Sequence, residues 1–502
     1  MADIDPVTLQ VMLGALRAAC EEMGVVLVRS AHSANIKERR DASTALFDAR
    51  GQMVMQAEHI PVHLGAMPSA VAAVLDEDHA DGDAWILNDP YRGGTHLPDI
   101  TAISPIFVDG DELIGFAASR AHHADVGGSV PGSMPADSTT LEDEGVVIPP
   151  AKLVSGGEVD RDVLDDLTGQ MRGPRQRVAD LRAQLAANRA GGRRLVELVE
   201  RYGLDDLRGA MDATLDYAER RTRAAIESLG GGGERGARDI LEARDGADLE
   251  LCLKATIDGS DLTLDFTGSA DAHDGNLNCP LSVTLSACYF AVRVLADPDV
   301  PPCAGAYRPI EVVAPEGCLL NATPPHAVVA GNVETSSRVA DLVLQAFGRA
   351  VGQGTMNNLT LGNDDFTYYE TIGGGQGACP DADGPSAVHV AMSNTLNTPV
   401  EALELEFPLR AVEYALRRGS GGDGDQRGGD GVVREVEALA DMSYSLLTER
   451  RQHAPPGADG GGDGEPGRNL LNGDELPSKA AGTLRAGDRL RIETPGGGGH
   501  GS

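Results

Sequence analysis

Residues 88–128 read NDPYRGGTHLPDITAISPIFVDGDELIGFAASRAHHADVGG, and this stretch decides the class of fold. Its apolar runs, TAISPIFV (101–108) and LIGFAAS (113–119), are short and lie between turn sequences rich in Gly, Asp and Pro. Runs of four to eight apolar residues with such boundaries are typical of β-strands. A further run, AWIL (84–87), precedes them. The pattern predicts that residues 45–130 are mostly strands and loops.

Two other regions have helical patterns. Residues 5–29 carry apolar side chains at helical spacing, with Asp5 placed as the N-cap and Pro6 in the first turn. Residues 159–229 contain no strand-like run and are rich in Arg and Leu. We expect one core-packed helix in the first region and two or more long helices in the second.

Glycines mark where these elements should end. The long helices should break near Gly191-Gly192 and Gly203, and the GGGGERG sequence from Gly230 predicts a hinge. After the hinge, residues 249–269 alternate between apolar and polar side chains around Asp258-Gly259. This pattern predicts a β-hairpin, and with it the start of another domain.

The rest of the chain gives weaker signals. Helices are expected at 281–295 and 334–350, and strands near 310–314, 387–392 and 490–495. The last hundred residues are rich in Gly and Asp, a composition that in isolation is typical of linkers or disorder.

These elements predict an α+β protein with several domains, in which a long helical insertion interrupts a mixed, β-rich body. A chain of 502 residues exceeds what one ordinary core contains. We expect an N-terminal α+β domain over 1–158, a helical segment over 159–230 and a C-terminal α+β domain over 236–502.

The composition excludes several partners. Asp and Glu number 77 against 42 Lys and Arg, for a formal net charge of −35. Such a charge repels phosphate backbones and anionic lipids, so we expect neither nucleic acid nor a membrane as partner. Only four of the basic residues are lysines, a composition that resembles proteins of a salt-adapted, halophilic cytosol.

The cysteines and the apolar runs indicate the compartment. The seven cysteines are scattered without a C-x-x-C pair, so they predict reduced thiols and no disulfide framework. The N-terminus lacks a basic region followed by an apolar one, and no run reaches the roughly 18 apolar residues of a membrane span. A cytoplasmic, soluble protein is expected.

The polar residues that flank the two apolar runs suit a metal centre. His96 and Asp99 lie three apart in a turn, so both side chains can point at one spot, and one of His122 and His123 must face the inward side of its strand. Imidazole and carboxylate together suit Zn, Mn or Fe better than Ca. The alternative is that His96 only braces a turn and that the His pair supplies one core and one exposed side chain.

Other polar residues leave two interpretations open. Asp41 follows the first helix among charged residues, and Glu58, His59 and His63 lie close together after it. The simpler interpretation is a surface salt-bridge cluster and a polar strand end. Asp125 can orient a ligand imidazole or take a proton, but it can equally cap a turn.

A last polar segment, AGNVETSSRVADLVLQAFG (330–348), leads into an amphipathic helix. Its free N–H groups could hold an anion, although ordinary N-capping by Thr335 or Ser336 is simpler. The chain has no G-x-x-x-x-G-K-[ST], no G-x-S-x-G and no G-x-G-x-x-G in a strand–helix context. P-loop, α/β-hydrolase and dinucleotide-binding sites are therefore not expected.

Taken in order, these motifs resemble the hydantoinase B/5-oxoprolinase B-subunit family over nearly the whole chain. Because the Gly- and Asp-rich C-terminal third belongs to the folded body in that family, the resemblance implies that this part is folded. The matching stretches are SANIKERRDAS (33–43), EHIPVHLGAM (58–67), NDPYRGGTHLPDI (88–100), RAHHADVGGSVPGSMP (120–135), EGVVIPP (144–150), DFTGS (265–269), GNVETSSR (331–338), GSGGDGDQRGGDG (419–431) and TPGGGGHG (494–501).

The resemblance implies a B-type subunit in a hetero-oligomer with a hydantoinase A-type subunit. The A-type subunit holds ATP and phosphorylates a cyclic amide, and the B-type subunit opens the activated ring with a metal-bound water. Carried over by motif, the implied ligands of a divalent transition metal are Asp41, His96, Asp99 and one of His122 and His123, with His122 preferred. His63, His123 and Asp125 are the candidate catalytic residues.

Two alternatives to hydrolysis of a hydantoin or 5-oxoproline ring stay open. Relatives in ketone carboxylases, which include the acetone carboxylase alpha subunits, join a phosphorylated enol to carbon dioxide. A scaffold would bind the A-type subunit without chemistry of its own. The sequence does not distinguish the metal or the ring substrate.

Overall fold

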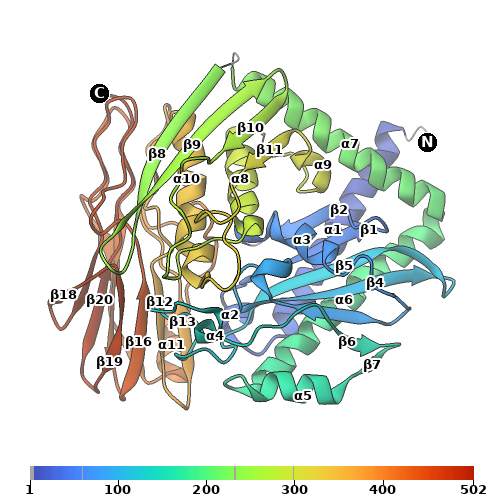
Figure 1. The fold of residues 1–502 in the computed structure, drawn as a ribbon, viewed down its shortest axis with the longest axis horizontal. Helices are drawn as coiled ribbons and strands as arrows, with labels where there is room; N and C mark the ends of the chain where they lie inside the picture. The colour runs from blue at the N-terminus through green and yellow to red at the C-terminus, as the bar shows by residue number, and fades with distance from the viewer. Residues whose placement is uncertain (1–4, 59, 231–232, 298) are drawn as a thin grey trace.

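A seven-stranded antiparallel sheet is built from strands within the first 160 residues (Figure 1). The computed structural model describes residues 5–502 apart from 59, 231–232 and 298. The sheet confirms the β pattern predicted for residues 45–130. In spatial order its strands are β2 (Met53–Glu58), β1 (Ala42–Asp48), β5 (Glu112–His122), β4 (Asp99–Val108), β3 (Ala84–Leu87), β6 (Ala151–Ser155) and β7 (Glu158–Val159).

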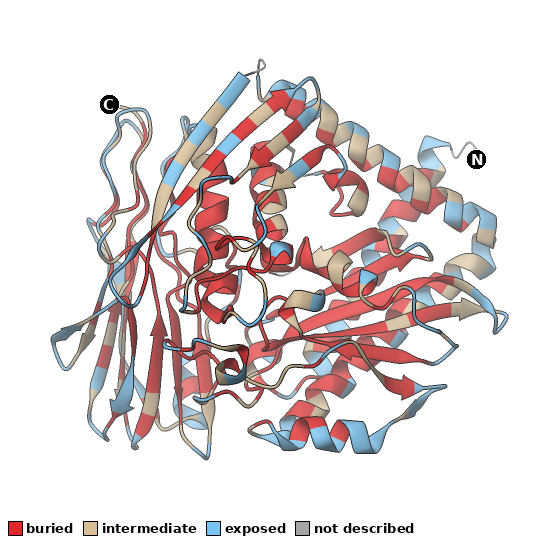
Figure 2. Cartoon of the chain, in the orientation of Figure 1, coloured by how far each residue is buried: buried red, intermediate tan, exposed pale blue. Residues whose placement is uncertain are grey.

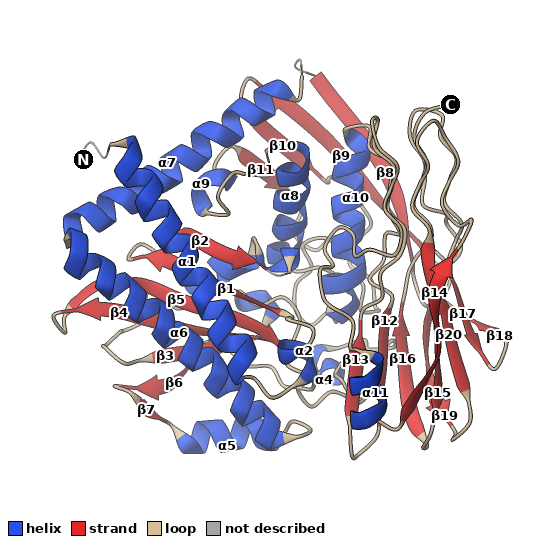
Figure 3. Cartoon of the chain, turned by 180° about the vertical axis from the view of Figure 1, so that it is seen from behind, coloured by secondary structure: helices blue, strands red, loops and turns tan. Residues whose placement is uncertain are grey.

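Long helices cover one face of this sheet (Figure 3). The first begins as predicted, because the Asp5 carboxylate accepts hydrogen bonds from the amides of Val7 and Thr8, and Pro6 lies in the first turn. It packs against the longest helix and against the edge of the sheet. The helices of this part are α1 (Pro6–Ser30), α5 (Arg161–Gly169), α6 (Pro174–Tyr202) and α7 (Leu204–Ser228).

The predicted helix break at Gly191-Gly192 is wrong. α6 runs through both glycines without interruption. A Cβ added to Gly191 would lie 2.3 Å from the sulfur of Met23 in α1, so this glycine lets two helices approach closely. The other predicted break is confirmed, because Gly203 has a φ of 90° and separates α6 from α7.

A second sheet and two buried helices follow. The hairpin predicted around Asp258-Gly259 is confirmed and joins the two middle strands of the sheet. The predicted hinge includes residues 231–232, which lie outside the described residues. Both helix predictions in this part are confirmed. The sheet consists of β11 (Ile310–Val313), β10 (Asp261–Asp265), β9 (Asp248–Asp258) and β8 (Gly233–Glu242), and the helices are α8 (Leu281–Leu295) and α10 (Ser336–Ala346).

Two antiparallel sheets form the C-terminal part. Their apolar faces share one core, to which Leu361, Val436 and Ile492 contribute. One sheet contains β13 (Thr367–Glu370), β12 (Asn358–Gly362), β16 (Met442–Leu447) and β19 (Lys479–Leu484). The other contains β14 (Leu409–Arg417), β15 (Gly431–Ala438), β20 (Arg489–Glu493), β17 (Arg468–Leu471) and β18 (Asp474–Leu476).

Of the three strands predicted in the second half of the chain, two are confirmed and one is wrong. β11 and β20 occupy the segments predicted at 310–314 and 490–495. Residues 387–392 form no strand, because Val388 pairs only with Gly374 in an isolated bridge. Ala387 and Ala391 have φ of 57° and 50°, which breaks the extended conformation that a strand needs.

The Gly- and Asp-rich segments near the C-terminus are folded, as the resemblance implies. They hydrogen-bond to one another through their backbones; the amide of Gly497, for example, donates to the carbonyl of Gly429 at 2.9 Å. A Cβ added to Gly428 would lie 2.0 Å from the carbonyl oxygen of Gly497. Only glycine permits such an approach of two backbones, so the composition that resembles a linker here specifies structure.

Together these elements form an α+β fold with several antiparallel sheets, as predicted. Buried residues concentrate where the sheets meet α8 and α10 (Figure 2). No helix in the described part of the chain is both long and apolar enough to span a bilayer. The predicted division at 158, 230 and 236 stays a prediction. The short helices are α2 (Ala34–Lys37), α3 (Ala66–Ala72), α4 (Leu141–Glu144), α9 (Ala304–Tyr307), α11 (Val400–Glu406), η1 (Pro61–His63), η2 (Pro90–Arg92) and the π-helix η3 (Gly331–Thr335).

Candidate metal centre

Asp99 and His122 face each other across two paired strands. β4 begins at Asp99, β5 ends at His122, and the register pairs these two residues directly. Directly opposed residues project to the same face of a sheet. His96 reaches the same point from the turn before β4, where its carbonyl accepts a hydrogen bond from the amide of Asp99 at 3.1 Å. One strand pair and one short turn thus assemble three potential ligands.

The three side chains bring their donor atoms to one point. Nε2 of His96 lies 3.2 Å from Oδ1 of Asp99, Nδ1 of His122 lies 3.3 Å from the same oxygen, and the two nitrogens are 3.2 Å apart. All three side chains are at most 3% exposed. Ligand atoms about 2.0–2.1 Å from a shared tetrahedral centre lie roughly 3.3–3.4 Å apart, so the spacing fits one transition-metal ion.

The hydrogen bonding around the rings supports this fit. His96 Nδ1 and His122 Nε2 are buried and meet no hydrogen-bond partner among the described residues. Because no acceptor holds a proton on the outer nitrogens, the inner nitrogens can donate to Asp99 when no ion is present, or give their lone pairs to a cation while the protons move outward. Two imidazoles and one carboxylate are a donor set for Zn, Mn or Fe.

Asp99 is held in its ionised form. Burial alone would raise its pKa, but the charge of the His96 imidazole and hydrogen bonds from His122, His63 and His96 hold the pKa of this carboxyl well below its usual range. Its second oxygen, Oδ2, accepts a hydrogen bond from Thr95 Oγ1 at 2.6 Å. The carboxylate is therefore both charged and fixed in orientation, as a ligand needs to be.

His63 approaches the same carboxylate from the other side. Its Nε2 lies 3.4 Å from Oδ2 of Asp99, and its Nδ1 lies 2.8 Å from Ser43 Oγ. The chain brings it there through η1, which follows β2. His63 thus lies beside the three-residue cluster and contacts the Asp99 oxygen that the other two histidines leave free.

Asp41 lines the same cavity but stands outside the cluster. Its backbone carbonyl accepts a hydrogen bond from the amide of His122 at 3.0 Å, which fixes the end of β5. The ligand atoms that lie within 4.8 Å of one another come from His96, Asp99 and His122. The cavity itself encloses only about 20 Å³.

His123 lies on the opposite face of the sheet, against α6. Its Nε2 is 2.9 Å from Oε1 of Gln184, whose Nε2 donates to the carbonyls of Ile100 and Ser119. Because these carbonyls fix the Gln184 amide, His123 Nε2 must carry the proton. Burial lowers the pKa of His123 to about 4, so the ring is neutral. His122, not His123, reaches the cluster.

Asp125 does not reach the cavity. Its carboxylate accepts hydrogen bonds from the amides of Gly127 and Gly132 at 2.8 Å and lies 3.1 Å from a guanidinium nitrogen of Arg172. These contacts close the turn that follows β5. His59 and the side chain of Glu58 lie outside the described residues.

The polar segment before α10 is built differently from the N-cap that we predicted. Residues of η3 continue directly into α10, so neither Thr335 nor Ser336 caps a free helix end. Thr335 donates instead to the carbonyl of Leu277, and Ser336 to that of Asn332. Burial and the charge of Glu449 raise the pKa of Glu334 to about 8, so this π-helical residue holds a proton at neutral pH.

The sequence reasoning missed the residues that close the cavity from the second half of the chain. The Tyr369 ring stacks on His122 with centroids 4.7 Å apart, and the Arg39 guanidinium lies 4.6 Å from the same ring. Arg39 also donates to the carbonyl of Tyr369 at 2.7 Å and to Thr371 Oγ1 at 2.9 Å. Arg39 lies within SANIKERRDAS, and this motif was the one available signal for it.

We call residues 387–398 the roof segment, because Met392, Ser393, Asn394 and Thr395 line the metal cavity. The segment is anchored at both ends. Val388 pairs with Gly374, and the amide of Leu396 donates to the carbonyl of Arg39 at 3.2 Å. A second cavity of about 480 Å³, which we call the outer cavity, shares Ser393 and Asn394 with the metal cavity.

Comparison with known proteins gives a consistent result. The family model "Hydantoinase B/oxoprolinase" matches residues 5–502. 5-oxoprolinase 1 of Arabidopsis thaliana is 40% identical over 99% of this chain and 42% of its own length. A protein of Pseudomonas sp. (strain NS671), named as the B-type subunit of a D-/L-hydantoinase, is 35% identical over 99% of this chain and 90% of its own length.

The solved structures agree. The crystal structure of the ATP-dependent caprolactamase from Pseudomonas jessenii superposes with a TM-score of 0.92 at 30% identity, over 99% of this chain and 91% of that one. This chain spans about two fifths of the length of the 5-oxoprolinases that it matches. On this evidence the chain is a member of the hydantoinase B/oxoprolinase family.

Proposed function

We propose that this chain is the B-type subunit of an ATP-dependent cyclic amide hydrolase. In this proposal a partner A-type subunit phosphorylates the amide oxygen of a ring such as a hydantoin or 5-oxoproline, and this chain opens the activated ring. The single observation that carries the proposal is the buried convergence of His96, Asp99 and His122 in a chain of this family.

The lengths of the relatives support a partner subunit. The chain corresponds to about two fifths of 5-oxoprolinase 1, and it matches the Pseudomonas sp. hydantoinase polypeptide over nearly the full length of that relative. We propose that ATP is used on an A-type subunit. We propose a hetero-oligomer of these two chains.

The cluster would hold a divalent transition metal through His96 Nε2, Asp99 Oδ1 and His122 Nδ1, and Asp41 is a further carboxylate residue that lines the cavity. When bound, such an ion lowers the pKa of water towards 7 and stabilises negative charge that develops on oxygen. The protein's own contribution is orientation: Thr95 and His63 fix Asp99, and Tyr369 fixes the plane of His122.

His63 is the residue best placed to move a proton. It is buried, lines the cavity and is linked to Ser43 on its far side. His123 and Asp125 have other roles, since His123 supports the sheet through Gln184 and Asp125 closes a turn. We propose His63 as the acid–base residue and treat the other two as positioning residues.

Ring opening in this cavity requires the roof segment to move. A volume of about 20 Å³ holds no more than a water-sized group, whereas a five-membered ring needs several times more space. The outer cavity of about 480 Å³ lies within the size range of ligand sites. We propose that substrate first occupies the outer cavity and reaches the cluster when residues 389–395 swing away.

The test measures metal and turnover in the same preparations. Wild type, His96→Ala and Asp99→Ala are purified in molar KCl without chelator, with His326→Ala as a control histidine outside the cavity. We expect about one equivalent of Zn, Mn or Fe in wild type and the control, and loss of the metal in both cluster variants with unchanged circular dichroism. Turnover of hydantoin and 5-oxoproline with ATP and the A-type subunit should fall in parallel.

Each other outcome has a defined meaning. Protein without metal in any form would refute the metal proposal. Ring opening that survives Asp99→Ala, together with intact complex formation, would make this chain a scaffold. Incorporation of labelled carbon dioxide into a ketone, with no ring opening, would show the carboxylase reaction instead.

A further inference from the structure

A buried asparagine lines the metal cavity and has no part in the function proposed above. Asn332 is 3% exposed and belongs to the wall of this cavity. Its backbone lies in the π-helix η3, within the polar segment that leads into α10. Short π-helical turns are rare and occur frequently at functional sites. Asn332 is therefore a candidate for direct contact with a ligand.

The carboxamide of Asn332 has no partner inside the protein. Its Oδ1 is buried without a donor, and no described residue hydrogen-bonds to its Nδ2. The buried Asn278 is different, because its Oδ1 accepts from the amide of His273 and its Nδ2 donates to the carbonyls of Gly275 and Ala327. A buried polar group without a partner destabilises the folded state, so a ligand that pairs with it gains affinity.

Backbone packing holds Asn332 in place although its side chain makes no hydrogen bond. The amide of Asn332 donates to the carbonyl of Val328 at 3.2 Å, and the amide of the preceding Gly331 donates to the carbonyl of Asn276 at 2.9 Å. A Cβ added to Gly331 would lie 1.8 Å from the carbonyl oxygen of Asn278, so the π-helix lies directly against a neighbouring backbone. These contacts fix the main chain and leave the carboxamide free to turn about its Cβ–Cγ bond.

A small cyclic amide has the shape that a free carboxamide recognises. An open-chain secondary amide prefers the trans form, in which N–H and C=O point in opposite directions. A five-membered ring holds its amide in the cis form, so N–H and C=O point to the same side. An asparagine side chain likewise carries one C=O and an NH₂ group side by side. The two groups match as a pair of hydrogen bonds.

We propose that Asn332 recognises the cis amide of a small ring and so selects cyclic over open-chain amides. The ring N–H donates to Oδ1, and Nδ2 donates to the ring carbonyl. The roof segment closes the metal cavity, so this contact forms only after residues 389–395 have moved. The inference rests on the proposed function, because it names the substrate class of the same cavity.

The same side chain suits the activated ring. Phosphorylation of the amide oxygen releases the N–H proton to solvent, so the ring nitrogen becomes an acceptor. Because no neighbour fixes the carboxamide, it can turn its Nδ2 toward this nitrogen. When the oxygen of a water molecule bonds to the ring carbon and its proton passes to His63, the π electrons of the C=N bond move to the nitrogen. A donor at this position stabilises them.

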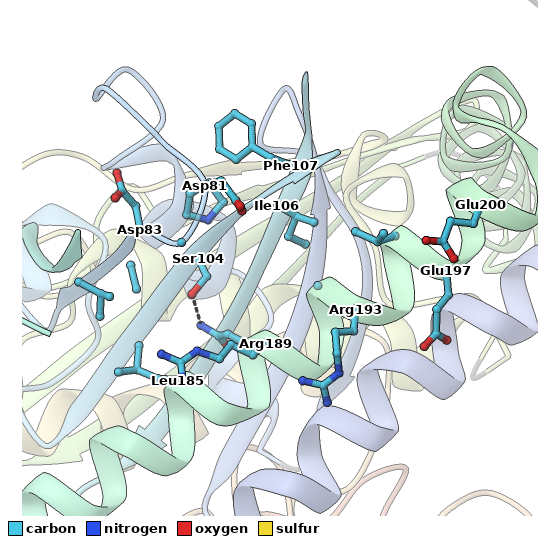
Figure 4. A pocket seen from close by; sticks show the side chains of 17 residues that line it. Asp81, Asp83, Ser104, Ile106, Phe107, Leu185, Arg189, Arg193, Glu197 and Glu200 are labelled. Atoms are coloured by element: carbon cyan, nitrogen blue, oxygen red, sulfur yellow. Dashed lines mark hydrogen bonds between the residues drawn. The ribbon is translucent and has the colours of Figure 1, made fainter. Parts of the chain in front are cut away.

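The groove between β4 and α6 is not suited to these rings, although its volume is about 620 Å³ (Figure 4). It shares no lining residue with the metal cavity. Its carboxylates outnumber its guanidinium groups, with Asp81, Asp83, Glu197 and Glu200 against Arg189 and Arg193. Such a lining disfavours the carboxylate of 5-oxoproline and the phosphate of an activated ring. We therefore place ring recognition in the metal cavity.

Binding of three neutral probes to the full chain tests the recognition separately from turnover. The first, 2-pyrrolidinone, has a cis amide; cyclopentanone has CH₂ in place of N–H; N-methylacetamide is trans. Titrations followed by saturation-transfer NMR in molar KCl give the three dissociation constants. We expect 2-pyrrolidinone to bind about tenfold more tightly than either of the others, because each of them loses one of the two hydrogen bonds.

Variants locate the contact. Asn332→Ala removes the carboxamide and Asn332→Leu replaces it with a branched apolar group, so both should bind the three probes with similar affinity. Asn363→Leu, at an asparagine outside the metal cavity, should keep the preference of wild type. Metal content and circular dichroism melts of the Asn332 variants should match wild type. With ATP and the A-type subunit, kcat/KM for 5-oxoproline should fall about tenfold or more in both.

The two arms separate this inference from the proposed function. Equal affinity of the three probes for wild type, or an unchanged preference in both Asn332 variants, would overturn the inference even if wild type opens rings. A preference that depends on Asn332, in a chain that opens no ring with ATP and the A-type subunit, would refute the proposed function and support the recognition of cyclic amides.

Discussion

Acidification should loosen the roof segment through one histidine. His389 belongs to this segment and its ring is largely buried, with Nδ1 2.7 Å from Ser393 Oγ, and its Nε2 meets no partner among the described residues. Burial and the nearby charge of Arg39 lower the pKa of His389 to about 4. The ring is therefore neutral when the segment is closed.

The magnitude follows from the difference between the two states. In an open segment the histidine would titrate near its ordinary pKa of about 6.5. Between pH 6.5 and 4 the open state binds more protons, so the closed state loses stability as the pH falls through this window. Between pH 7 and 5.5 the closed state should lose at most about 1.2 kcal/mol of stability, which is about an eightfold change in the opening equilibrium. This value is an upper limit because part of the ring stays accessible in the closed state.

Hydrogen exchange measures this opening directly. Protection of the amides of residues 389–395, corrected for the intrinsic effect of pH, should fall up to about eightfold between pH 7 and 5.5. His389→Asn places an amide near the position of Nδ1 and cannot titrate, so its protection should not change with pH. The same loss of protection in wild type and variant would refute the reasoning, as would a loss spread evenly over the whole chain.

Three further predictions concern stability. Arg39→Gln removes buried, charged hydrogen bonds to the cavity wall and should lower the free energy of urea unfolding by about 3 kcal/mol. Arg40→Gln, at the exposed neighbouring position, should change this free energy little. Equal effects of the two substitutions would contradict the structure. Gly428→Ala places a Cβ 2.0 Å from a backbone oxygen and should lower the free energy of unfolding by more than about 4 kcal/mol. In Gly14→Ala, in α1, the added Cβ meets nothing within 4 Å, so this substitution should be neutral or stabilising by about 1 kcal/mol. Thermal unfolding followed by circular dichroism measures both effects. The midpoint of urea unfolding should rise with KCl because screening weakens repulsion among the excess carboxylates, and a falling midpoint would contradict the halophilic interpretation.

Local patterns predicted much of the sheet that carries the candidate site. The apolar runs at 101–108 and 113–119 are strands because their boundaries are turns, and their pairing brings Asp99 opposite His122. Periodicity also left open which histidine of the pair faces inward. The register of β4 on β5 gives His122 to the cluster, and the contact with Gln184 gives His123 to the opposite face.

Long-range packing explains most of what the sequence did not predict. Tyr369 and Thr395 reach the site from more than 200 residues away, and nothing in their local sequence indicates the contact. Gly191-Gly192 has the local sequence of a helix break, but Gly191 instead permits the close approach of α1 to α6. Residues 387–392 have strand-forming side chains, but two left-handed alanines turn them into the roof segment.

The position of the three candidate ligands has a consequence for the order of folding. His96, Asp99 and His122 all lie on one hairpin and its leading turn, so they need only a short loop to close. Tyr369 and the roof segment are synthesised much later. We expect an ion to be taken up by the N-terminal half during synthesis and to be enclosed when the second half folds over it. Exchange of that ion from the finished protein should then be slow and limited by reopening, so growth conditions during expression, and not the purification buffer, would decide which metal is found.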